Sequence, residues 1–156
     1  MAILESAIMF KGENLIEKQF YSTEDVLDKN IRNSLLQAIS GLASNAFNDE
    51  IRSFSLGDYS IILMTQILSD PNQINNPSYT PSFQDTLLMF CICEKNTDEK
   101  AIQKGMSDAL FQFQNRYSLN DIYAKKKKKF KNFTKRLDNI FKDLILKSED
   151  RFKLLF

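Results

Sequence analysis

Hydrophobic and polar positions along this chain change their period several times, and the order of the changes predicts the elements. Two short strands are expected within residues 3–21, around a turn at residues 11–14 in which Gly12 and Asn14 can adopt positive φ. A helix is expected next, over residues 22–45, because apolar residues recur there at every third or fourth position.

Three strands are expected within residues 51–94. Residues 51–56 alternate, a Gly57-Asp58 turn follows, and residues 59–68 are strongly strand-like. A proline-containing loop over residues 69–82 is interpreted as either functional or disordered. The almost continuous apolar run of residues 83–94 is typical of a central strand that is covered on both faces. The exposed edge of the sheet is expected at the second or the third strand.

Two helices are expected to complete the fold. The first begins at residues 96–99 with Asn96 or Thr97 as its cap, and the second begins at Ser118. The apolar stripe of the first is Ile102, Met106, Ala109, Phe113 and Tyr117. The apolar positions of the second are Ile122, Phe130, Phe133, Leu137, Ile140, Phe141 and Leu144. We predict one domain over residues 1–147, followed by a short tail, 148–156, with an apolar end.

This order of elements resembles the longin domain, which sedlin-like trafficking subunits share. The most similar local stretches are Glu-Ser-Ala-Ile-Met-Phe at residues 5–10, with the following Gly12 turn, and Phe-Ser-Leu-Gly-Asp-Tyr at residues 54–59. The resemblance extends from residue 3 to about residue 146 and rests on element order, without a short motif. It implies an α+β fold of order ββαβββαα: a five-stranded, mostly antiparallel sheet with one helix on one face and two on the other.

The resemblance also implies a function. Longin-type domains are non-catalytic platforms, so the implied partners are a small GTPase, a longin or roadblock-type subunit, or a second copy in a homodimer. The implied setting is small GTPase regulation or vesicle trafficking by an adaptor. Separately, a cytoplasmic location is expected because no signal peptide and no long apolar stretch is visible, and the lysine-rich residues 125–131 suggest peripheral contact with an anionic membrane. Profilin and PAS-type sensors share the helix-and-sheet theme, so a sensor that holds a small molecule is the alternative.

Composition argues against an enzyme and against a bound cofactor or metal. The chain has no histidine, which excludes Ser-His-Asp and Cys-His catalysis and removes the commonest metal ligand. Its four glycines form no phosphate-binding motif. Cys91 and Cys93 are interpreted as small buried hydrophobic residues in a reducing compartment, placed on opposite faces of a strand where a disulfide between them would be strained.

One cluster of charge stands out in a chain whose net charge is only +1. It comprises Lys125, Lys126, Lys127, Lys128, Lys129 and Lys131. Five successive residues point all round a helix, so Lys126 would fall on the apolar stripe, in a turn that is frayed, projecting or snorkelling. We interpret the cluster either as a solvated helix start or as a contact for an acidic partner or anionic lipid. Nucleic acid is disfavoured because no stacking aromatic residues are interleaved with the lysines.

Overall fold

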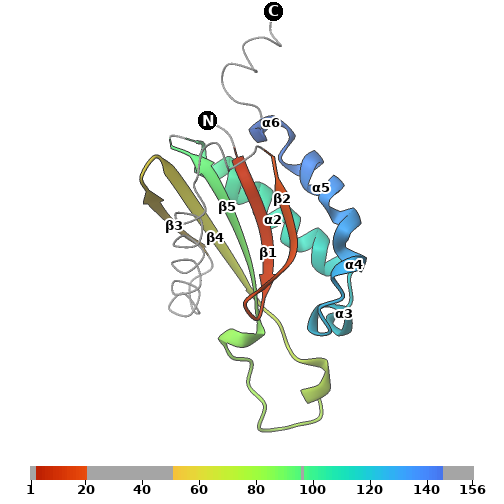
Figure 1. Ribbon diagram of the computed structural model, residues 1–156. Helices are drawn as coiled ribbons and strands as arrows, with labels where there is room; N and C mark the ends of the chain where they lie inside the picture. The colour runs from red at the N-terminus through yellow and green to blue at the C-terminus, as the bar shows by residue number, and fades with distance from the viewer. Residues whose placement is uncertain (1–2, 21–50, 96, 146–156) are drawn as a thin grey trace, which may run out of the picture.

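Five strands form one antiparallel sheet in the computed structural model, which describes residues 3–20, 51–95 and 97–145 (Figure 1). The strands lie in the order β2-β1-β5-β4-β3. Their bounds are Ile3–Phe10 for β1, Glu13–Gln19 for β2, Ile51–Leu56 for β3, Tyr59–Ile67 for β4 and Thr86–Glu94 for β5. The predicted α+β class and five-stranded antiparallel sheet are confirmed. The helix predicted over residues 22–45 and the tail at 148–156 lie outside the described residues.

Tight turns join the two hairpins. Lys11 and Gly12 have φ values of 49° and 78°, so both central residues of the first turn are left-handed, as a two-residue hairpin requires. Asn14, which we had expected to adopt positive φ, is instead a residue of β2. Gly57, at φ 59°, makes the turn between β3 and β4 as predicted.

The most apolar strand lies in the middle of the sheet. β5 pairs with β1 on one side and with β4 on the other, and seven consecutive residues from Leu87 to Cys93 are buried. This confirms the prediction of a central strand. Its first predicted residues, 83–85, form the 3₁₀ turn η2 (Phe83–Asp85) instead. The edges of the sheet are β2 and β3, the two strands for which an exposed edge was predicted.

Helices cover one face of the sheet in the described part of the chain (Figure 1). Their bounds are Glu99–Arg116 for α2, Leu119–Tyr123 for α3, Lys127–Phe130 for α4, Thr134–Ile140 for α5 and Lys142–Ile145 for α6, with a 3₁₀ turn, η3 (Lys131–Phe133), between α4 and α5. Asp98 caps α2 by accepting the N–H of Ala101 at 3.3 Å, so the cap expected at Asn96 or Thr97 was placed too early. Ser118 caps α3 as predicted.

The prediction of one continuous final helix is wrong. Lys125 has a φ of 53° and ends the helical path after α3, and α4 begins only at Lys127. An unbroken helix would have turned Lys126 toward the core. The break instead lets Ile122 and Phe130 both be fully buried while Lys126 stays exposed. Five of the seven predicted apolar positions are therefore buried, and Ile140 and Leu144 pack partly buried against the same core, although the predicted helical continuity is wrong.

Aromatic rings fill the space between the sheet and these helices. Phe113 of α2 lies 5.1 Å from Phe130 and 5.3 Å from Phe133, measured between ring centroids, and all three are fully buried. A Cβ atom added at Gly105 would lie 2.6 Å from Cε1 of Phe141, which shows how closely α2 approaches the turn between α5 and α6. This face is therefore closely packed from β1 to the last helices.

Both faces of the sheet are buried. Cys91 and Cys93 belong to the core cluster under the helices, whereas Phe90 and Ile92 belong to the cluster on the opposite face. The two cysteines thus share a face, and the expectation of opposite faces was wrong because strand side chains alternate with a period of two. Both are free thiols, and burial raises the pKa of Cys91 to about 12, so it behaves as a small hydrophobic residue. None of the described helices has the length and apolar character needed to cross a bilayer.

Candidate interaction surfaces

The lysine cluster (Lys125 to Lys129 and Lys131) gathers at the joint between α3 and α4, next to the β1–β2 turn. Lys125 and Lys127 each place Nζ 3.1 Å from a carboxylate oxygen of Glu13, the first residue of β2. Hydrogen bonds from these two ammonium groups hold the pKa of Glu13 below its usual value. The positive φ of Lys125 turns the chain here, and Lys125 and Lys127 meet at one carboxylate.

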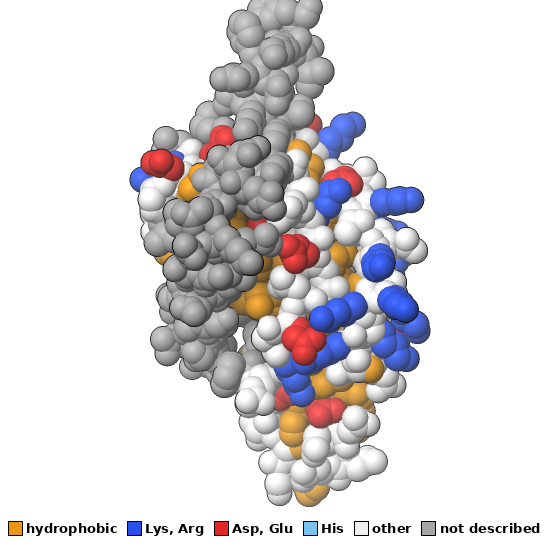
Figure 2. Space-filling model, in the orientation of Figure 1, with side chains coloured by type: hydrophobic (Ala, Val, Ile, Leu, Met, Phe, Trp, Pro, Cys, Tyr) orange, Lys and Arg blue, Asp and Glu red, His pale blue; other side chains and the backbone are white. Residues whose placement is uncertain are grey.

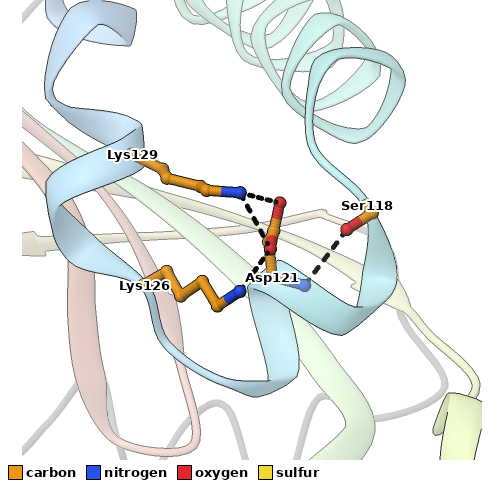
Figure 3. A network of polar contacts seen from close by, with 4 residues as sticks. All are labelled: Ser118, Asp121, Lys126 and Lys129. Carbon is orange, nitrogen blue, oxygen red and sulfur yellow. Dashed lines mark hydrogen bonds and ion pairs between the residues drawn. The ribbon is translucent and has the colours of Figure 1, made fainter.

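A second carboxylate holds another pair of lysines (Figure 3). Nζ of Lys126 and Nζ of Lys129 each lie 3.2 Å from an oxygen of Asp121. The backbone N–H of Asp121 donates to the hydroxyl of Ser118, so the cap of α3 also positions this carboxylate. Hydrogen bonds from the two lysines hold the pKa of Asp121 below its usual value. Exposed ion pairs of this kind add little stability, so their effect is chiefly to order the side chains.

Two members of the cluster remain uncompensated. Lys128 and Lys131 are exposed and form no ion pair with any residue in the described ranges. Two carboxylates therefore face four ammonium groups while two more lysines point to solvent, and the joint keeps a net positive charge. Figure 2 shows blue side chains gathered over the helical side of the molecule, with only a few red ones among them. The structure thus brings all six predicted lysines into one basic region.

A buried carboxylate attaches the β4–β5 loop to this region. The hydroxyl of Tyr123, the last residue of α3, donates to Oδ1 of Asp85 at 2.7 Å, and the N–H of Ser82 donates to Oδ2 at 2.9 Å. Asp85 is only 7% exposed, and burial by itself would raise its pKa. These hydrogen bonds, another from Tyr79 and the charge of Lys11 outweigh burial and hold the pKa below its usual value. We name this set of contacts around Asp85 the loop anchor.

The loop itself is folded. The N–H of Leu68 donates to the carbonyl of Asp85 at 2.7 Å and closes its base, and Asp70 caps the 3₁₀ turn η1 (Pro71–Gln73) through its side chain. The loop projects beyond the end of the sheet (Figure 1), and Ile74, directly after η1, is 72% exposed. The sequence allowed the loop to be either functional or disordered. Its described residues adopt a hydrogen-bonded conformation, so the structure does not support disorder.

A groove runs between α2 and β4 on the helical face. Its volume is about 490 Å³, its β4 wall is formed by Met64, Thr65 and Gln66, and its other wall is the face of α2 from Lys100 to Gln114. Phe111 is 67% exposed and supplies most of the apolar surface, because Leu110 and Met64 are buried. Lys100 and Lys104 line the N-terminal half of the α2 wall. The groove therefore combines an exposed aromatic ring with positive charge.

Sequence reasoning missed both the groove and the loop anchor. Phe111 lies off the apolar stripe of its helix, and a large aromatic residue on a polar helix face was a signal that could have identified it. The loop anchor left no comparable signal, because Asp85 and Tyr123 are 38 residues apart in the chain. No three Cys, Asp or Glu side chains converge as metal ligands within the described ranges.

No protein-family model matches this chain, and no curated protein matches it in sequence. Its function must therefore be argued from its own surfaces.

Proposed function

We propose that this chain is a non-catalytic protein-interaction platform of longin type, which binds a helix of a partner protein in the α2–β4 groove. The observation that carries the proposal is the exposure of Phe111 on a helix face that is otherwise polar. A phenylalanine ring in this position gains from being covered, and large aromatic residues are enriched among the anchors of protein interfaces.

The shape of the helix layer favours a helix as the occupant. α2 packs against β4, whereas the next strand, β3, carries the exposed serines Ser53 and Ser55 on this face. These serines pair with Ile62 and Ser60 of β4, and Ile62 lies in the core under the helices, which defines the face. Short side chains at the edge leave room for one more helix beside α2, as in helix-in-groove recognition.

The charge of the groove limits the chemistry of that helix. From Lys100 to Gln114 the wall is roughly 20 Å long, which matches about four helical turns of the partner. An amphipathic helix would lay its apolar face on Phe111 and on the small exposed parts of Met64 and Leu110. Acidic residues at one end would then face Lys100 and Lys104, which would raise the association rate and fix the orientation.

The class of partner follows from the resemblance. A platform of longin type would tether or regulate a small GTPase, a longin or roadblock-type subunit, or a second copy of itself in a trafficking-type assembly. The sheet order, with edges at β2 and β3, is compatible with that resemblance. The sensor alternative needs a ligand space between sheet and helices. On the face that α2 to α6 cover, the rings of Phe113, Phe130 and Phe133 occupy that space at centroid separations close to 5 Å.

The test is a pull-down with the full chain in the presence of GDP or of a non-hydrolysable GTP analogue, read by mass spectrometry. Wild-type protein, Phe111→Asp and the control Leu119→Asp are compared, since Leu119 is another exposed apolar residue, on α3 and away from the groove. We expect a small GTPase or a longin-type subunit with wild type and control, and at least a tenfold loss with Phe111→Asp.

Two results would contradict the proposal. If the same proteins are captured by Phe111→Asp and by wild type, the groove is not the binding surface. If native mass spectrometry of the purified chain reveals a stoichiometric small molecule and no partner is captured, the sensor alternative takes its place.

A further inference from the structure

The loop and the lysine cluster form one end of the molecule. Tyr123 binds Asp85 at the base of the loop, and the lysine run begins two residues later at Lys125. Lys125 and Lys127 in turn bind Glu13 beside the β1–β2 turn. The hydrogen bond and the ion pairs thus join three segments that are distant in sequence, and the loop extends beyond them (Figures 1 and 2).

The composition of the loop is unusual for a solvent-exposed segment. Residues 71–84 contain no charged residue, and Ile74, directly after η1, is the most exposed large hydrophobic side chain among the described residues. The only acids at its ends are engaged: Asp70 caps η1, and Asp85 accepts the hydrogen bonds of the loop anchor. An uncharged, mostly polar loop with one strongly exposed isoleucine therefore projects from the end of the molecule that carries the net positive charge.

We propose that this end of the molecule binds the surface of an anionic phospholipid membrane, with the loop among the headgroups and the lysine cluster against their phosphates. A membrane fits better than an acidic protein, because the surface projects instead of forming a groove. A projecting loop with one exposed apolar residue, at the same end of the molecule as the lysine cluster, matches a planar boundary that is apolar below and negatively charged above. The α2–β4 groove takes no part, so this inference stands independently of the proposed function.

Neither feature would suffice alone. One basic residue near an anionic membrane contributes about fivefold to affinity, and one isoleucine that leaves water completely adds about tenfold or more. Lys128 and Lys131 contribute most, because the other four lysines already face carboxylates. The resulting contact is weak, reversible and sensitive to salt, since the interaction of exposed charges is screened within about 8 Å at physiological ionic strength.

The test is vesicle flotation of the full chain. Vesicles of phosphatidylcholine alone are compared with vesicles that also contain phosphatidylserine, at low and at physiological ionic strength. We expect binding only to the anionic vesicles, weakening as salt rises. The double variant Lys128→Glu with Lys131→Glu should lose at least tenfold in binding, and Ile74→Asp at least threefold. Neither variant removes a described ion pair, so circular dichroism should show an unchanged fold.

The matched control carries the same change of charge at the other end of the molecule. Lys95, just after β5, and Lys142, on α6, are both exposed, and the ends of β5 and α6 lie opposite the loop in Figure 1. Lys95→Glu with Lys142→Glu should therefore bind anionic vesicles as wild type does. The proposal is overturned if wild type does not bind anionic vesicles or binds neutral ones equally. It is equally overturned if the control loses as much as the lysine variant, or if Ile74→Asp binds unchanged.

Discussion

The two edge strands of this sheet, β2 and β3, have different surroundings, although both belong to hairpins of similar length. The β2 edge is covered by α4 and α5, and Lys18 of β2 reaches Asp138 of α5 at 3.7 Å. At the β3 edge, by contrast, the helix layer of the described residues ends at α2 and leaves a groove beside exposed serines. Unpaired strand edges invite association, so natural proteins cover or charge them. The comparison indicates that packed helices close the β2 edge, whereas the β3 edge lies on the side where the proposed partner would bind.

The same contrast appears within one helix. Phe113 and Phe111 of α2 are two residues apart. Phe113 is fully buried among the aromatic rings under the helices, whereas Phe111 is two-thirds exposed in the α2–β4 groove. A helix turns by about 200° over two residues, so these two phenylalanines point in nearly opposite directions, one into the core and the other to the surface. Composition alone cannot distinguish the two roles.

The largest expected effect comes from removing the buried ring. Phe113→Ala should lower the free energy of unfolding by about 3–5 kcal/mol, because it deletes contacts with Phe130 and Phe133 and leaves a cavity. Phe111→Ala, the same chemical change, should alter it by less than about 0.5 kcal/mol. Urea denaturation of both variants measures the difference. Equal losses would mean that the groove side is as closely packed as the β2 side.

A substitution at Gly105 tests how closely α2 packs against the turn between α5 and α6. At an open helical position, glycine to alanine stabilises by about 1 kcal/mol. Here the new Cβ would lie 2.6 Å from the buried ring of Phe141, so Gly105→Ala should instead destabilise by about 1–3 kcal/mol. Gly105→Ser should do the same, whereas Ser107→Ala on the groove wall should be neutral or slightly stabilising. Thermal unfolding gives the sign, and a higher melting temperature for Gly105→Ala would refute the close contact.

Tyr123, which belongs to the loop anchor, and Tyr117, which does not, form a matched pair for mutation. Tyr123→Phe removes the hydroxyl that donates to Asp85 and should cost about 1–2 kcal/mol, because a buried carboxylate loses a donor. Tyr117→Phe removes a buried hydroxyl that has no hydrogen-bond partner in the described structure, so it should be neutral or stabilising. Chemical denaturation at neutral pH compares the two. Equal effects would show that the hydrogen bond to Asp85 adds no stability.

Acid unfolding measures the same anchor independently. The pKa of Asp85 is lower in the folded chain than its ordinary value, so folding favours the ionised carboxylate. Its contribution is therefore complete above roughly pH 4 and disappears as the pH falls through the lower folded pKa. Asp85→Asn should destabilise the chain by about 1–3 kcal/mol at neutral pH and flatten the acid limb of the stability curve. An unchanged acid limb would contradict the assigned pKa direction.

How much of this could be predicted from the sequence depended on the range of the interactions. The central position of β5, the edges at β2 and β3, and the buried positions from Ile122 to Phe141 follow from local hydrophobic patterning, and the predictions were correct. The break at Lys125 was not foreseen, because it depends on a backbone angle and on core contacts that decide which residues face inward. Lys125 meets Glu13 across 112 residues, a pairing that no local pattern contains.

The smallest effect concerns the charged pair at the β2 edge. Lys18 and Asp138 are both partly exposed at 3.7 Å, so Lys18→Ala should cost no more than about 0.5–1 kcal/mol. Lys18→Asp adds repulsion, and combining it with Asp138→Lys should restore the lost stability if the pair interacts. A double-mutant cycle in low and high salt measures this coupling, which salt should weaken. A coupling near zero would leave α4 and α5 as the cover of this edge. The contrast with the β3 edge would then rest on packing alone, because no helix in the described chain takes the place beside Ser53 and Ser55 that α4 and α5 take beside β2.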